Sequence, residues 1–164
     1  MTTAYIGVGT NIEREKHTRA AIEELSKLDS ALRVSPIYEC KAVGFGGSAF
    51  YNFVIELNTS LTLTEFSQKL RKIELKWGRK ENAQKYQDRT LDLDIILFGK
   101  QISKANPIVP RDDIYKYPFV IQPLCDLAPG LVLPESGDKV CDIWAQMDGL
   151  DSLTVLDFYF NGVL

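Results

Sequence analysis

Histidine and cysteine are scarce in this sequence of 164 residues. The only histidine, His17, lies in the charged stretch EREKHTRA. We expect it on the solvated surface of a helix, so an enzymatic reaction of this chain would not use histidine as its acid or base. The cysteines Cys40, Cys125 and Cys141 are odd in number, far apart and without a C-x-x-C pair. This pattern argues against a disulfide framework and against a zinc site.

Long apolar runs and an excess of positive charge are also lacking. No apolar run approaches the roughly 20 residues that cross a bilayer. The start, MTTAYIGVGT, has no basic stretch followed by a long apolar segment, so it does not resemble a secretory signal. The net charge of −3 does not favour nucleic acid or an anionic membrane surface. We therefore expect a cytoplasmic protein that binds neither membranes nor nucleic acids.

The apolar pattern predicts an α+β fold, and without repeats or linkers residues 1–164 are expected to form one domain. Strand patterns cover residues 3–9, 31–40, 50–60 and 90–98, with Pro36 marking an edge or a bulge in the second. Helical patterns cover residues 17–28 and 62–78, and a C-terminal extension carries a helix around 119–128. Thr62 and Glu65 have the spacing of a capping box. This order predicts the βαββαβ (split βαβ) sandwich, an antiparallel sheet with two helices on one face.

The stretch DRTLDLDIIL places two aspartates in an apolar strand. Because side chains alternate along a strand, Asp92 and Asp94 share one face, with Cα atoms about 7 Å apart. The other face is expected to carry Leu91, Leu93, Ile95 and Leu97. Two ionised carboxylates that converge repel each other unless a cation lies between them, and hard oxygen donors on a rigid strand suit Mg²⁺.

The polar segment before this strand is rich in positive charge, with Arg79, Lys80, Lys85 and Arg89. A metal–polyphosphate site requires basic side chains that bind the phosphate oxygens and, beside them, carboxylates that bind Mg²⁺. The alternative is that the sheet has one solvated face and that the basic segment is a solvated loop. Spacing alone leaves both interpretations open.

Several segments together resemble one enzyme family. DRTLDLDIILFG is similar to the signature of the 6-hydroxymethyl-7,8-dihydropterin pyrophosphokinases, and the other matching segments follow in the same order. These segments are AYIGVGTNI, SPIYECKAVGF, FYNFVIEL, IELKWGR and VPRDDIYKYPFVIQPLCDLAP. The resemblance covers nearly the whole chain. It implies a ferredoxin-like fold and a monomeric enzyme that transfers pyrophosphate from ATP to the pterin hydroxymethyl group in folate biosynthesis, releasing AMP.

The resemblance also implies roles for the residues of the nucleotide side. Asp92 and Asp94 match the aspartates that hold two Mg²⁺ ions, and Asp94 could also help the hydroxyl group to lose its proton. Arg79 and Arg89 match basic residues near the triphosphate and are counted as catalytic. The remaining nucleotide-side positions are Glu74, Tyr86, Ile95 and Arg111. Glu74 could equally be a surface residue of its helix.

On the pterin side, Asn52 matches an asparagine that reads the ring by hydrogen bonds, and Phe119 matches an aromatic residue that stacks on it. Phe119 could equally belong to the core. The pocket would also include Phe50, Val43 and Cys40. The turn residues Gly9 and Asn11 are expected to be structural.

The departures from the family pattern lie mainly on the nucleotide side. Arg111 stands where the family has a histidine, Asp112 where it has a tyrosine or an equivalent, and Tyr117 where it has an arginine. Two interpretations follow. We favour a divergent pyrophosphokinase with a changed ATP site, and the alternative is a paralog that binds a pterin or a nucleotide with weak or altered catalysis. A domain that only makes protein or nucleic-acid contacts finds little support in the charge and motifs.

Overall fold

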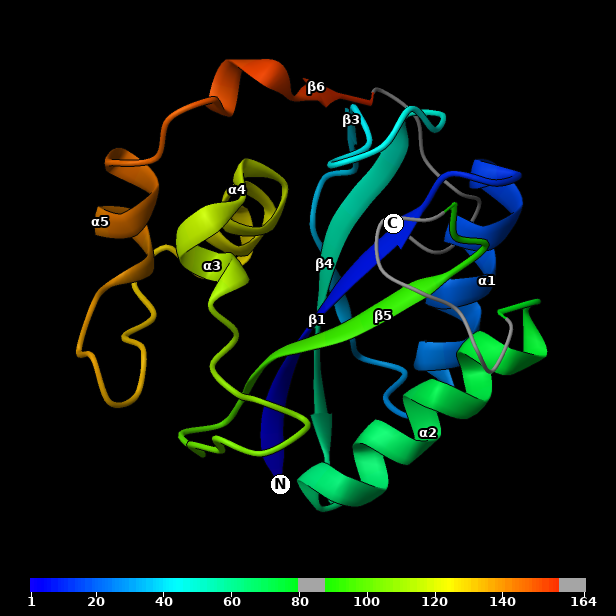
Figure 1. The fold of residues 1–164 in the computed structure, drawn as a ribbon. Coiled ribbons are helices and arrows are strands. Elements are labelled where there is room, and N and C mark those ends of the chain that lie inside the picture. The colour runs from blue at the N-terminus through cyan, green and yellow to red at the C-terminus, as the bar shows by residue number, and fades with distance from the viewer. Residues whose placement is uncertain (80–87, 157–164) are drawn as a thin grey trace.

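A computed structural model describes residues 1–79 and 88–156 of the chain (Figure 1). The strands are β1 (Thr2–Thr10), β2 (Arg33–Val34), β3 (Tyr38–Cys40), β4 (Phe50–Thr59), β5 (Asp92–Phe98) and β6 (Thr154–Val155). The helices are α1 (Arg14–Ser26), α2 (Leu63–Lys76), α3 (Asp113–Lys116), α4 (Pro118–Leu127) and α5 (Val140–Ala145), with a 3-10 turn at Leu150–Ser152. The strands form one antiparallel sheet in the order β5-β1-β4-β3-β6, and β2 also pairs with β4. The predicted α+β architecture is confirmed.

Helices α1 and α2 cover one face of the sheet, as predicted (Figure 1). Alternate residues of the long strands are buried beneath these helices because side chains alternate between the two faces. The strand residues of this core include Ile6, Val8, Phe53, Ile55, Leu93 and Ile95. Helix α2 begins with the predicted capping box, in which Thr62 and Glu65 each accept a hydrogen bond from the other's backbone amide.

The C-terminal extension covers part of the opposite face. Its predicted helix around 119–128 is confirmed as α4, whose position on that face the sequence had not predicted. A second core joins Tyr5, Val54 and Ile96 of the sheet to apolar residues of α4 and its neighbours. In Figure 1 the α3–α5 segment and the α1–α2 pair lie on opposite sides of the sheet. The molecule therefore has three layers, and β6 adds a short strand beside β3.

Three local expectations differ from the structure or are refined by it. Leu97 packs in the second core because a register shift between Tyr5 and Ile6 of the partner strand β1 leaves Ile96 as an extra residue in β5. His17 is buried, because α1 begins at Arg14 and turns this side chain towards Trp77, while its Nδ1 lies 2.6 Å from the Ile12 carbonyl oxygen. The segment around Pro36 is divided into β2 and β3, as its lack of an amide donor predicted.

All three cysteines are free thiols, which agrees with the expected lack of disulfides. Across residues 1–79 and 88–156, no helix combines the length and apolar character needed to cross a membrane.

Candidate active site

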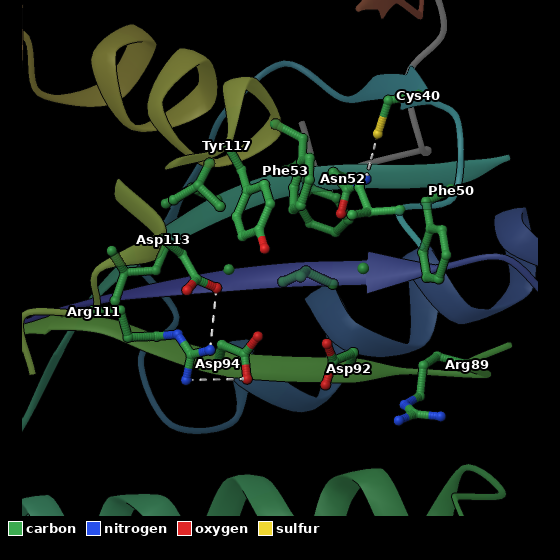
Figure 2. Close-up of a pocket in the computed structure, with 18 of the residues that line it drawn as sticks. Cys40, Phe50, Asn52, Phe53, Arg89, Asp92, Asp94, Arg111, Asp113 and Tyr117 are labelled. Atoms are coloured by element: carbon green, nitrogen blue, oxygen red, sulfur yellow. Dashed lines mark hydrogen bonds and ion pairs between the residues drawn. The ribbon is translucent and has the colours of Figure 1, made fainter. Parts of the chain in front are cut away.

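A cavity of about 310 Å³ opens on the sheet face that α3 and α4 cover only in part (Figure 2). Its floor consists of two rows of residues that the antiparallel pairing brings together. In one row Gly9 lies between Asn52 and Asp92, and in the other Gly7 lies between Val54 and Asp94. The β3–β4 loop and the segment from Arg111 to Val120 supply the walls.

The two glycines of β1 keep this floor open. A Cβ atom at Gly9 would lie 3.0 Å from Asn52 Oδ1, and one at Gly7 would lie 3.1 Å from Ile96 Cδ1. A side chain at Gly9 would stand between the amide of Asn52 and Asp92, and one at Gly7 would stand beside Asp94. Gly9 was expected to be a structural residue of the opening turn, and the structure places it within β1, in the cavity floor. The signal was available, because glycines that alternate within a strand mark a close approach of other groups.

Asp92 and Asp94 project from the same face of β5 into the cavity, as the alternation predicted (Figure 2). Each carboxylate has an arginine beside it. Arg79 Nη1 donates to Asp92 Oδ1 at 2.8 Å, and Arg111 Nη1 lies 3.8 Å from Asp94 Oδ1. Burial, and then the neighbouring Asp92 carboxylate, raise the pKa of Asp94 to about 8, although Arg111 acts in the opposite direction. A further cation bound between Asp92 and Asp94 would favour the ionised form of Asp94.

Glu74 lies directly beneath Arg79 and is buried, so the alternative of a surface residue is excluded. Its Oε2 atom accepts hydrogen bonds from Arg79 Nη1 and from the Leu93 amide, both at 2.8 Å. Burial raises the pKa of Glu74 to about 7, while the Leu93 amide and Arg79 act to lower it. Glu74 therefore holds Arg79 against Asp92 and ties α2 to the edge strand.

At the other end of the cavity, the Asn52 side chain is oriented by Cys40. Asn52 Nδ2 donates to Cys40 Sγ at 2.8 Å, and burial raises the pKa of this thiol to about 11, which keeps it neutral. The walls at this end are aromatic. The rings of Tyr117 and Phe119 stack with centroids 4.9 Å apart, and Phe50 packs edge-on against Phe45. A flat, polar heterocycle would find both a hydrogen-bonding amide and ring faces here.

The acid pair has the donor chemistry of a Mg²⁺ site. Asp92 and Asp94 offer hard carboxylate oxygens from a rigid strand, which is the type of ligand that Mg²⁺ takes together with substrate phosphates and water. Within the described ranges, no group of three or more His, Cys, Asp or Glu side chains is gathered as a complete protein metal site. The residues fit an ion that receives most of its ligands from a bound substrate.

Comparison with known proteins identifies the family. A family model described as 7,8-dihydro-6-hydroxymethylpterin-pyrophosphokinase matches residues 5–129. The chain belongs to this enzyme family. It is 34% identical over 137 residues to the 2-amino-4-hydroxy-6-hydroxymethyldihydropteridine pyrophosphokinase of Aquifex aeolicus, covering 82% of this chain and 85% of that protein. For the enzyme of the same name from Bacillus subtilis the identity is 33% over 157 residues, with coverages of 90% and 93%.

A third relative is the "Folic acid synthesis protein fol1" of Pneumocystis carinii. It is 33% identical over 161 residues, which cover 96% of this chain and 22% of that longer protein. The resemblance suggested by the sequence motifs is thus confirmed.

Most of the residues predicted for the site line the cavity described above. They are Cys40, Val43, Phe50, Asn52, Arg79, Arg89, Asp92, Asp94, Arg111 and Phe119. Glu74 does not line the cavity but holds Arg79, which does, through a hydrogen bond. Tyr86 lies outside the described residues. The side chain of Ile95 does not line the cavity, because it points to the opposite face of the sheet and is buried under the helices. The predicted site residues did not include Asp113 and Phe45, although both lie in segments that match the family and both line the cavity.

Proposed function

We propose that this protein transfers pyrophosphate from ATP to the hydroxymethyl group of 6-hydroxymethyl-7,8-dihydropterin and releases AMP, with two Mg²⁺ ions as cofactors. The main support is that the same cavity contains the carboxylates of Asp92 and Asp94 at one end and the Asn52 amide with aromatic side chains around it at the other. Gly7 and Gly9 form the floor between them. We propose that the enzyme is cytoplasmic and acts as a monomer, in which one chain supplies both the acid pair and the pterin end of the cavity.

On the nucleotide side, Asp92 and Asp94 would hold the metal, which supplies positive charge to the phosphate oxygens when bound. Arg79, Arg89 and Arg111 also line the cavity and offer guanidinium groups to the remaining phosphate oxygens. Transfer of this kind depends on positioning and charge neutralisation more than on covalent catalysis. A chain whose one histidine is buried beside Trp77, away from the cavity, can therefore carry it out.

On the pterin side, Asn52 would read the polar edge of the ring, and Phe119, Phe50 and Tyr117 would contact its faces. The Cys40 thiol keeps the Asn52 amide in one orientation, so its carbonyl oxygen remains available above Gly9. Asp94, whose raised pKa favours the protonated state, would take part in proton exchange with the hydroxymethyl group only after a cation ionises it.

The direct test measures AMP formation with MgATP, with and without the pterin. We expect AMP only when both substrates are present, and a loss of about a hundredfold or more in Asp92→Asn and in Asp94→Asn. Lys104→Gln is a suitable control, because Lys104 pairs with Glu135 on the exposed surface. Full turnover in both aspartate variants would show that the acid pair is not the metal site.

A second candidate is a paralog that binds the pterin without efficient transfer. It is favoured by Arg111, which replaces a family histidine and lies against both Asp94 and Asp113. This candidate predicts saturable pterin binding by calorimetry but little AMP under saturating MgATP. Pterin-dependent AMP formation at a rate well above that of Asp94→Asn would exclude it.

A further inference from the structure

Arg111 is held beside β5 in a defined position. Its backbone amide donates to the Ile96 carbonyl at 3.0 Å, which places the residue next to the edge strand. From there its side chain reaches back to the acid pair, with Nη2 donating to Asp113 Oδ2 at 3.1 Å and Nη1 at 3.8 Å from Asp94 Oδ1 (Figure 2). Asp113 thus positions a permanent positive charge directly beside Asp94.

The two arginines of the acid pair differ in how firmly they are held. Moving Arg79 away would leave the buried carboxylate of Glu74 without its cation, which is strongly unfavourable. Neither partner of Arg111 is enclosed like Glu74: the Asp94 carboxylate lies deep in the protein, but both partners face the cavity, with 39% of the Asp94 side chain and 28% of the Asp113 side chain exposed. Water or another cation can replace Arg111 there at a lower cost.

We propose that Arg111 competes with a divalent cation for Asp94, so that the metal binds fully there only when Arg111 turns to another anion. This rests on the proposed function, because the anion in question is the nucleotide's phosphate chain. The consequence is that the protein without nucleotide binds divalent metal weakly, and that nucleotide and metal strengthen each other's binding. Arg111, which stands where the family has a histidine, therefore makes full metal binding at Asp94 depend on nucleotide binding.

The physical basis is repulsion between like charges. A guanidinium and a divalent ion that share the Asp94 carboxylate lie close together in a partly desolvated cavity, where little water screens them. Removing the charge of Arg111 should raise the affinity for Mn²⁺, used as a substitute for Mg²⁺, by about tenfold or more. Removing an equal charge from a distant surface should change the affinity little, because salt screens it.

The experiment measures Mn²⁺ binding from the electron paramagnetic resonance of the free ion. Because Arg111 acts to lower the pKa of Asp94, its removal leaves this carboxyl group more protonated, and each variant is therefore compared with the parent protein at several pH values from about 7 to about 9. Neither ATP nor pterin is added. Arg111→Gln is expected to gain affinity, Arg111→Lys should stay near the parent protein because it keeps a positive charge, and Lys104→Gln is the matched surface control. Arg111→Met keeps the apolar stem and replaces Arg111→Gln if that variant does not fold.

An affinity in folded Arg111→Gln or Arg111→Met equal to that of the parent protein would overturn the proposal. So would an equal gain in Lys104→Gln, which would show a general charge effect. A gain that persists when Asp94→Asn is added would place the metal elsewhere, and this too would contradict it. Because the measurement contains no substrate, its result is independent of AMP formation, so failure of this inference and failure of the proposed function are distinguishable.

Discussion

Glu74→Ala tests how much the hydrogen bond between Glu74 and the edge strand β5 stabilises the protein beneath the candidate active site. Strand β5 lies at one end of the sheet order, and no strand within residues 1–79 and 88–156 pairs with its outward amides. The Leu93 amide instead donates to Glu74 Oε2 at 2.8 Å, and Arg79 donates to the same oxygen. Alanine at position 74 removes the acceptor of both donors.

The expected loss follows from these two contacts. A buried amide left without a partner costs about 1–3 kcal/mol. Arg79 keeps its second carboxylate, Asp92, so the loss of one ion pair adds little to this. We expect the free energy of unfolding to fall by about 2 kcal/mol, which for a chain of this size lowers the melting temperature by about 4–8 °C.

Urea denaturation of the substrate-free protein measures this loss, and Glu24→Ala is the matched control. Glu24 is also a helix glutamate with only 9% of its side chain exposed, but its partners Lys27 and Lys76 are 68% and 57% exposed. Those lysines remain solvated when Glu24 is removed, so the expected loss is about 0.5 kcal/mol or less. Glu74→Gln keeps an oxygen acceptor and should lose about half as much as Glu74→Ala. If Glu74→Ala loses no more than Glu24→Ala, the capping of β5 by Glu74 has no energetic importance.

Three further outcomes test the cavity. Gly9→Ala places a methyl group 3.0 Å from Asn52 Oδ1 and should weaken pterin binding, measured by calorimetry, by about tenfold; unchanged affinity would contradict the role of the floor. Cys40→Ala leaves Asn52 Nδ2 without its acceptor and should weaken pterin binding by about five- to tenfold, whereas Cys40→Ser should bind like the parent protein. Because a metal binds the ionised form of Asp94, whose pKa is raised, Mn²⁺ affinity should rise by up to about tenfold per pH unit from about pH 6 to about pH 8, with proton release. A flat pH profile would show that Asp94 does not bind the ion.

Local patterns were predicted correctly where one physical rule governs them. The capping box of Thr62 and Glu65 and the shared face of Asp92 and Asp94 both follow from neighbouring residues and the period of the element. Two predictions were wrong because a distant contact intervenes. The register shift opposite Tyr5 moves Leu97 to the other core, and the packing of α1 against Trp77 buries His17.

By itself, the sequence determined the order of the elements, the acid pair on one strand face and the family to which the chain belongs. These depend on alternation, capping and motif spacing, all of which act over a few residues. Only the tertiary structure decided that α3 and α4 close the other side of the sheet, that Gly7 and Gly9 form a cavity floor, and that Glu74 and Arg111 hold opposite ends of the acid pair. Such contacts join residues far apart in the chain. The alternating glycines mark a close approach in the sequence, but strand pairing and side-chain packing decide which groups approach them.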